Sequence, residues 1–172
     1  AEEFAKEMLP LAQMGATILG GCCGTTPLHI WKMIQNLENV KAEIPEKKQI
    51  RALTNERNFL EIDLDGAFSI VGERINPTGK KNLQEELRQK KMDLVIDMAE
   101  EQVAKGAKIL DVNMGTNGID EKEMMLMAVN ELTLAVDVPL CIDSSYVDIV
   151  EEALRIYPGR ALINSISLDR KS

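Results

Sequence analysis

The sequence predicts an α/β protein of the (β/α)8 barrel type, and three observations agree on this. Four apolar segments of strand length recur along the chain, and the stretches between them carry apolar residues at helical spacing. Each apolar segment also runs into a short polar cluster. In a parallel barrel, the side chains at the carboxyl ends of the strands meet around one ligand. The segments that end in these clusters are 69–79, 108–115, 139–145 and 161–167.

The first elements expected from the amino terminus are a helix, a strand and a second helix. Residues 2–13 are helix formers, and Gly15 is suited to end that helix. Residues 16–19 are a short strand candidate that we expect to be buried. Thr26 can cap the next helix, with Pro27 in its first turn. Leu28, Trp31, Ile34 and Leu37 then form an apolar stripe at three-residue spacing, and Trp31 is expected to serve in helix packing.

The later helices separate the four strand candidates. Apolar residues lie on one face of residues 94–103, and Gly106 closes that helix. Residues 120–136 carry a Met-rich face, and residues 146–157 form a third helix that Pro158 stops. Strands that alternate with amphipathic helices predict a parallel sheet. An open doubly wound sheet is the alternative, but it would gather its ligand groups at one switch point, whereas here every strand ends in a polar cluster.

A charged and irregular stretch over residues 38–57, which includes Pro45, is the best candidate for a domain boundary. The chain begins within a helix-like segment and stops just after a strand candidate. We therefore expect it to be a piece of a longer polypeptide.

Composition and charge exclude several classes of function. The formal net charge of −8 argues against nucleic-acid binding, which needs clustered Lys and Arg. No apolar run approaches the ~20 residues that span a bilayer, and no signal-peptide pattern opens the chain. Three cysteines, two of them adjacent, make a poor disulfide framework, so a reducing cytoplasm is the expected compartment. No glycine-rich phosphate loop follows any strand candidate.

The polar residues at the strand ends are hydrogen-bonding groups without an obvious nucleophile and base. The single histidine lies far in the sequence from Ser144, Ser145 and Ser165, so serine nucleophilic catalysis is not expected. The pattern favours capture of a polar heterocycle, although each residue by itself can also cap a neighbouring loop or helix. The candidate ligand residues are Glu73, Arg74, Asn76, Asp111, Asn113, Asp143 and Asn164.

Cys22 and Cys23 follow the first strand candidate and can place two thiolates on one metal ion. On residue chemistry alone, an adjacent pair of this kind is more often two small buried residues. His29 lies on the following helix and is not expected to join the cysteines, and Cys141 is expected to be a core residue inside a strand.

Four motifs resemble the pterin-binding domain of the cobalamin-dependent methionine synthase family: GERINPTG (72–79), LDVNMG (110–115), CIDSS (141–145) and RALINSIS (160–167). The corrinoid iron–sulfur protein methyltransferases share this set, and dihydropteroate synthase is similar to it more distantly. GATILGGCCGTTPLHI (15–30) resembles the end of the homocysteine-binding, zinc-dependent domain of the same family. The two resemblances stand in the family's order and cover nearly the whole chain.

The resemblance implies two barrels of the TIM type, each only partly covered. Residues 1–44 would be the C-terminal end of the homocysteine- and zinc-binding barrel, residues 45–66 an inter-domain linker, and residues 67–172 the N-terminal half of the pterin-binding barrel. The resemblance also implies that Cys22 and Cys23 are two zinc ligands, with the homocysteine sulfur in the open position. The family's third cysteine lies upstream, on an earlier strand.

For the pterin, the resemblance assigns Asp143 and Asn164 as direct contacts and as the residues that carry catalysis. Arg74 is expected to pair with Glu73 or Asp111 and to hold the carboxylates in place. The residues expected to complete the site as its floor and support are Asp111, Asn113, Glu73 and Asn76.

The reaction implied is transfer of the N5-methyl group of methyltetrahydrofolate to cob(I)alamin and then to zinc-activated homocysteine, which yields methionine and tetrahydrofolate. The cobalamin-binding domain would be another part of the same polypeptide. Two alternatives stay open: a corrinoid iron–sulfur protein methyltransferase, against which the cysteine module argues, and a non-catalytic structural piece. Half a barrel exposes two sheet edges, so we expect the isolated chain to self-associate or to be only partly folded. Without the later strands and the cobalamin-binding domain we also expect it to be inactive.

Overall fold

The computed structural model describes residues 1–41 and 50–166, and the chain divides into two compact units after Gln49. The part of the predicted linker at residues 42–49 and the end of the last polar cluster at Ser167 lie outside the described residues. No helix in the described ranges is long and apolar enough to cross a membrane.

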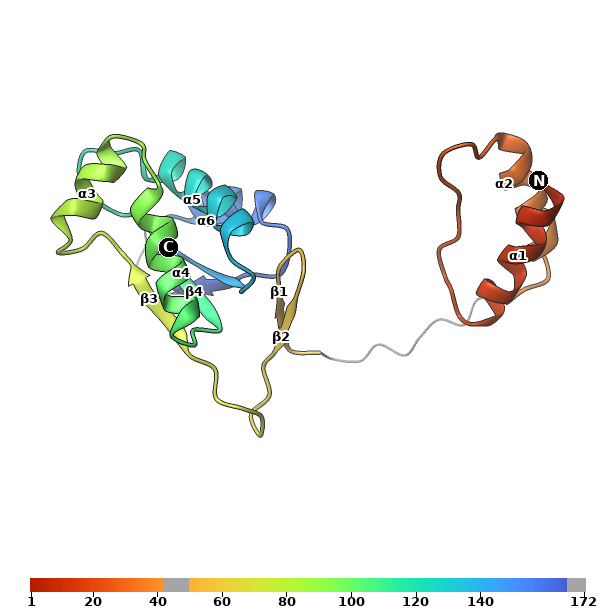
Figure 1. Ribbon diagram of the computed structural model, residues 1–172, viewed down its shortest axis with the longest axis horizontal. Helices are drawn as coiled ribbons and strands as arrows, with labels where there is room; N and C mark the ends of the chain where they lie inside the picture. Colours follow the sequence, from red (N-terminus) through yellow and green to blue (C-terminus); the bar gives the residue numbers. More distant parts are fainter. Residues whose placement is uncertain (42–49, 167–172) are drawn as a thin grey trace. The chain divides into compact units, whose positions relative to one another are not determined.

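The N-terminal unit contains two helices, α1 (Glu2–Gln13) and α2 (Pro27–Leu37), as the sequence predicts (Figure 1). Gly15 follows α1 with a φ of 98°, a conformation that a residue without a Cβ adopts readily. α2 begins with a capping box, in which His29 Nδ1 accepts a hydrogen bond from the Thr26 N–H at 3.3 Å. The residues next to each helix end therefore define where it stops or starts.

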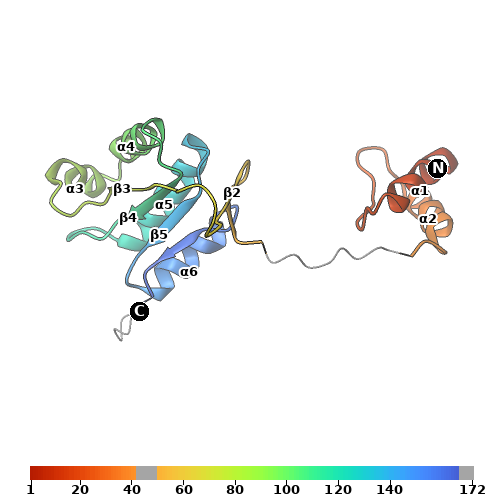
Figure 2. The same ribbon diagram turned by 90° about the horizontal axis from the view of Figure 1, so that it is seen from below.

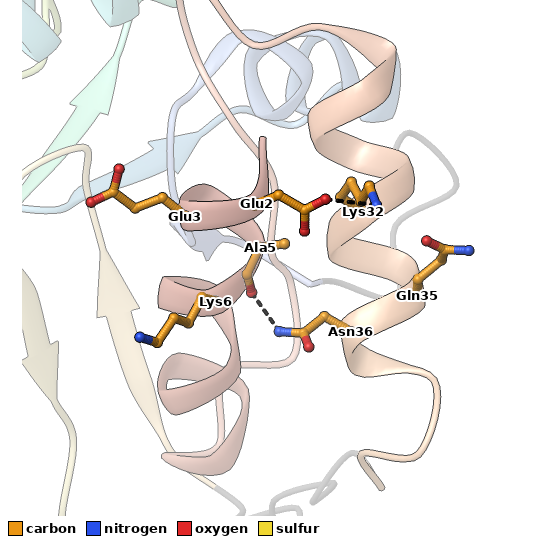
Figure 3. A pocket seen from close by; sticks show the side chains of 7 residues that line it. All are labelled: Glu2, Glu3, Ala5, Lys6, Lys32, Gln35 and Asn36. Atoms are coloured by element: carbon orange, nitrogen blue, oxygen red, sulfur yellow. Dashed lines mark hydrogen bonds and ion pairs between the residues drawn. The ribbon is translucent and has the colours of Figure 1, made fainter.

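α1 and α2 pack against each other, and Ala5 of α1 and Met33 of α2 are both buried. Figure 3 shows the surface hollow beside this contact. There, Glu2 and Lys32 form an ion pair at 2.7 Å, and Asn36 Nδ2 donates to the Ala5 carbonyl oxygen at 2.8 Å. The hollow is lined by residues of the two helices, and none of the predicted site residues is among them.

The packing role expected for Trp31 on α2 is wrong. Leu28 and Ile34 are exposed, and Trp31 is 51% exposed. α1 covers only one side of α2, and Met33 lies on that side. Leu28, Trp31 and Ile34 therefore lie outside the face of α2 that α1 covers, whereas Leu37 is half-buried.

The short strand predicted at residues 16–19 does not form, and Ile18 is 92% exposed. A strand needs a neighbour to satisfy its backbone N–H and C=O groups. The described part of the N-terminal unit holds two helices and no strand that could serve as that neighbour.

The C-terminal unit contains a four-stranded parallel sheet, in which strands adjacent in sequence are also adjacent in space. Each connection passes through helix, so the predicted βα units and the parallel pairing are confirmed (Figure 1 and Figure 2). This order is that of a barrel wall, whereas a doubly wound sheet reverses its order at a switch point. The strands are β3 (Val71–Ile75), β4 (Ile109–Asn113), β5 (Leu140–Asp143) and β6 (Leu162–Asn164).

The core of this unit lies between the sheet and its helices. Leu110 and Ile142 project from the middle strands into that layer and are fully buried together with Met124 and Met125 of the predicted Met-rich face. Three helices begin and end within about one residue of the predicted limits, and α3 is an addition that the sequence does not predict. The helices are α3 (Lys81–Arg88), α4 (Asp93–Ala104), α5 (Glu121–Ala135) and α6 (Val147–Ile156).

Part of the predicted linker is folded. β1 (Ala52–Thr54) and β2 (Phe59–Glu61) form an antiparallel hairpin. Its Leu53 packs with Ile109 and Cys141 at the N-terminal ends of the sheet strands. Strands of this length carry too little periodicity to be recognised in sequence. Residues 52–61, which the sequence predicts to be linker, are a structured part of the C-terminal unit.

The hairpin is attached by a set of contacts around Thr54. Tyr157 Oη donates to the Thr54 carbonyl oxygen at 2.9 Å and accepts from the Leu140 N–H at 3.3 Å. The Arg160 N–H donates to Thr54 Oγ1 at 2.8 Å. Gly159 permits this approach, because a Cβ there would lie 2.2 Å from the Thr54 carbonyl oxygen. The hairpin is therefore fixed at the starts of β5 and β6, which leaves the opposite, carboxyl ends of the strands to the polar clusters.

Candidate functional site

Three polar side chains stand in one row at the carboxyl ends of neighbouring strands. The register pairs Asn113 of β4 with Asp143 of β5, and Asp143 with Asn164 of β6. Residues paired in register point to the same face of a sheet, and so does Asp111, two positions before Asn113. The other face bears the helices, so we call this one the interior face. It brings together four of the predicted site residues.

Two hydrogen bonds join amides to carboxylates within this group. Asn113 Nδ2 donates to Asp143 Oδ2 at 2.9 Å, and Asn164 Nδ2 donates to Asp111 Oδ1 at 3.1 Å. Asn113 Oδ1 in turn accepts from the Gly115 N–H at 2.8 Å, which fixes the orientation of that amide. Hydrogen bonds to a charged acceptor are stronger than those between neutral groups. The carboxylates therefore orient the two amides.

The surroundings of Asp143 on the interior face raise the pKa of its carboxyl. Burial raises the pKa of the Asp143 carboxyl, and the negative charges of Asp111, Glu121 and Glu73 raise it further, while the hydrogen bond from Asn113 opposes them. Asp143 thus holds a proton more readily than an exposed aspartate, which suits a group that handles protons.

Glu121 is a member of this site that the sequence does not predict. It is the first residue of α5, and its Oε1 accepts from Ser144 Oγ at 2.6 Å. Ser144 Oγ also accepts from the Tyr146 N–H at 3.2 Å, so the buried hydroxyl has a partner on each side. Glu121 stands next to Asp120, whose side chain caps α5, and an acidic residue in a first turn suits any helix. Because an acidic residue in this position is common in any helix, the sequence alone gives no sign that Glu121 contacts the site.

The two polar residues of β3 point in different directions. The charge of Glu73 contributes to raising the pKa of Asp143 after burial, the largest cause, which places Glu73 near the interior face. Arg74 forms no ion pair with Glu73 or Asp111 in residues 50–166, so the predicted pairing is wrong. The pKa of Glu101 on α4 is lowered mainly by Lys105 and also by Arg74, so the guanidinium lies toward the helices.

Asn76 is engaged in the loop that follows β3. Its Oδ1 accepts from the Thr78 N–H at 2.9 Å, a turn that asparagine commonly makes with its own backbone. Beside this loop is a polar hollow of ≈ 640 Å³ that also borders Gly115, Glu121 and Tyr146. Sites for small molecules are commonly about 300–1,000 Å³. The loops after β3 and β4 therefore leave room for a ligand next to the interior face.

The cysteines of the two units have different surroundings. Cys22 and Cys23 are exposed and border a hollow of ≈ 590 Å³ together with His29. No group of three or more His, Cys, Asp or Glu side chains suited to a metal ion occurs among the residues described, and His29 Nδ1 lies 2.8 Å from Thr26 Oγ1. Cys141 is buried in the core as predicted, and burial raises the pKa of its thiol, so it remains protonated.

The sequence matches two family models. Residues 72–172, which include all of the parallel sheet except Val71, match the model described as Pterin binding enzyme. Residues 1–37, which include both helices of the N-terminal unit and the adjacent cysteines, match the model described as Homocysteine S-methyltransferase. The two matches occur in the order that the sequence resemblance predicts. The first of them covers more than half of the chain.

Proposed function

The chain belongs to the pterin binding enzyme family, and on that premise we propose that its C-terminal unit binds the pterin ring of methyltetrahydrofolate at the carboxyl ends of β4, β5 and β6. The two family matches support folate-dependent methyl transfer to homocysteine. Within that reaction, the part we propose for this unit is to hold the methyl donor and to prepare its N5 atom for loss of the methyl group.

The observation that carries the proposal is the row of Asn113, Asp143 and Asn164 with Asp111 behind it. A reduced pterin presents an amide, an amine and ring nitrogens along its edge. An ionised carboxylate accepts about four hydrogen bonds, and an amide both donates and accepts. Asp143 therefore retains acceptor capacity after the bond from Asn113, and the row can match the pterin edge. A site of this kind rejects rings that leave its polar groups unpaired.

Activation of N5 is the chemical problem that the site has to solve. N5 of methyltetrahydrofolate is a tertiary amine, which leaves only as it gains positive charge. Asp111 accepts a hydrogen bond from one N–H of Asn164, and the amide carbonyl of Asn164 can accept a hydrogen bond from a protonated N5. Asp143 can hold the proton nearby. As the bond between the methyl carbon and N5 breaks, its electron pair stays on N5, and the methyl group leaves for the acceptor.

The methyl acceptor that we propose is cob(I)alamin, held by a cobalamin-binding domain of the same polypeptide, with homocysteine as the final acceptor. For homocysteine, Cys22 and Cys23 offer two exposed neighbouring thiols, which suit zinc as thiolates. Bound zinc lowers the pKa of a coordinated thiol and so favours the reactive thiolate. Catalytic zinc sites usually have three protein ligands, so these two cysteines would need one more.

A corrinoid iron–sulfur protein methyltransferase is the second candidate function. It would use the same pterin site but would have no need of homocysteine. The match of residues 1–37 to the homocysteine S-methyltransferase model favours methionine synthesis over this candidate.

Calorimetric titration of the chain with methyltetrahydrofolate tests the pterin site. We expect saturable binding that Asp143→Ala and Asn164→Ala each weaken at least about tenfold, because a hydrogen bond to a charged group contributes about 1.5–3 kcal/mol. Matched controls are Asp97→Ala and Asn130→Ala, at exposed positions of α4 and α5, which should bind like the wild type. No saturable binding, or equal losses in the controls, would rule out this site.

A further inference from the structure

The register of β3 contains a bulge next to the site. Gly72 pairs with Leu110 of β4, but Ile75 pairs with Val112, so Glu73 and Arg74 together stand opposite the single residue between them. A bulge adds one residue to one strand and re-aims the side chains beyond it. Here the bulge lies opposite Asp111 of β4, whose side chain is on the interior face.

The bulge decides which residues of β3 face the helices and which face the site. Without it, Ile75 would align with Asn113 and point into the polar row, because a slip of one residue exchanges the two faces of a strand. With it, Ile75 is fully buried in the helix layer, and the register continued by one residue sets Asn76 beside Asn113. A polar residue thus takes the place of an isoleucine at the end of the row.

Gln102 of α4 supplies the contact that holds the bulge. Its Oε1 accepts from the backbone N–H of Arg74 at 2.7 Å, a donor that sits within the register shift. Its Nε2 donates to the Met98 carbonyl oxygen at 2.9 Å, and the residue is only 7% exposed. Both ends of the buried amide are therefore engaged, and a buried N–H left without its partner is costly.

Gly72 makes room for that contact. A Cβ at position 72 would lie 2.7 Å from Gln102 Oε1 and 3.1 Å from Leu110 Cδ2. A side chain there would have to push the glutamine away from β3. The hydrogen bond from the Arg74 N–H to Gln102 therefore depends on the glycine at position 72, although 30 positions separate Gly72 from Gln102 along the sequence.

We propose that Gln102 is a positioning residue for the site: it holds the bulge of β3, so that Ile75 packs into the core while Glu73 and Asn76 lie at the polar row. This role rests on the proposed function as far as the pterin is concerned. The effect on β3 itself can be measured without any ligand.

Hydrogen exchange at the Arg74 amide, followed by NMR, tests the proposal directly. In Gln102→Met, which keeps the size of the side chain but lacks the acceptor, we expect the Arg74 amide to exchange about tenfold faster, the change produced by about 1.4 kcal/mol. Gln102→Glu retains an acceptor oxygen and should restore slow exchange. Val95→Ala, a cavity-forming change on the same helix, should lower stability without selective exchange at Arg74.

Methyltetrahydrofolate affinity is the second readout. Gln102→Met should bind at least about fivefold more weakly than Val95→Ala when the two are compared at temperatures of equal stability, since only the first disturbs the row. Equal exchange at Arg74 in wild type and Gln102→Met, or equal affinity in the two variants, would overturn the proposal. If the Arg74 amide exchanges faster in Gln102→Met than in the wild type, but the wild type binds no methyltetrahydrofolate, the proposed function is contradicted. The role of Gln102 in holding the bulge is then still supported.

Discussion

The side-chain amide of Asn164 donates a hydrogen bond to Oδ1 of Asp111 at 3.1 Å, although β5 lies between the strands that carry the two residues. The bond spans the interior face above β5, and Asp111 is buried. The proposed N5-activating amide is therefore held by a carboxylate from a non-adjacent strand.

This pairing predicts a measurable energetic coupling. In a double-mutant cycle, Asp111→Ala and Asn164→Ala should be non-additive by about 1–2 kcal/mol in the free energy of unfolding from urea titrations. The matched cycle of Asp111→Ala with Asn130→Ala, an exposed position on α5, should be additive within about 0.5 kcal/mol. Additivity in both cycles would show that the bond contributes nothing to stability.

The raised pKa of Asp143 predicts a pH-dependent stability. The folded chain binds this proton more tightly than the unfolded chain, so the ionised side chain destabilises the fold at pH values above its folded pKa. Asp143→Asn keeps an acceptor for Asn113 and should raise the free energy of unfolding at about pH 7. The gain should shrink as the pH falls through the raised folded pKa and vanish below about pH 3.9, where the wild type carries the proton in both states. Urea unfolding at several pH values measures this. Asp97→Asn should show no such gain.

The attachment of the hairpin predicts a stability loss on removal of one hydroxyl. Tyr157→Phe deletes the bond to the Thr54 carbonyl oxygen and the acceptor of the Leu140 N–H, so thermal or urea unfolding should show a loss of about 1–3 kcal/mol. Tyr146→Phe, at an exposed tyrosine, should be nearly neutral. A neutral Tyr157→Phe would mean that apolar contacts alone fix the hairpin.

The edge strands predict self-association of the 172-residue chain. β6 is an edge of the described sheet, and its Ile163 is 45% exposed. Unpaired strand edges bind one another, and a lysine on such an edge opposes this. Ile163→Lys should therefore shift the sedimentation profile toward monomer, whereas Ala104→Lys on α4 changes the charge equally and should not. A wild-type chain that is already monomeric and unfolds cooperatively would contradict this expectation.

Zinc binding by this chain is predicted to be weak, because the parts that the structure describes contain only the two adjacent thiols at a plausible site. Competition with a chromophoric chelator should give sub-stoichiometric zinc, and Cys22→Ser should abolish it. Cys141→Ala, in the core of the other unit, should leave it unchanged. Tight binding of one zinc per chain would show that a third ligand is present.

Local patterns in the sequence were sufficient for elements that depend on neighbours a few residues away. Thr26 and Pro27 mark the start of α2, and apolar spacing places α5 and α6 within about one residue of their limits. The alternation of strands and helices determined the parallel sheet. Because parallel strands end at the same edge, it also implied that Asp143 and Asn164 would be neighbours.

Only the tertiary structure decided which distant groups meet. Residues 16–19 are apolar enough for a strand but have no described partner, whereas the hairpin forms because Tyr157 and Arg160 supply bonds that no local pattern reveals. The bulge held by Gln102 and the contact of Glu121 with the site depend in the same way on register and helix placement. The sequence alone determined that polar residues end the strands, because each polar cluster directly follows an apolar segment along the chain. Their pairing as donors and acceptors follows from side-chain contacts across the sheet, which only the folded chain brings within hydrogen-bond distance.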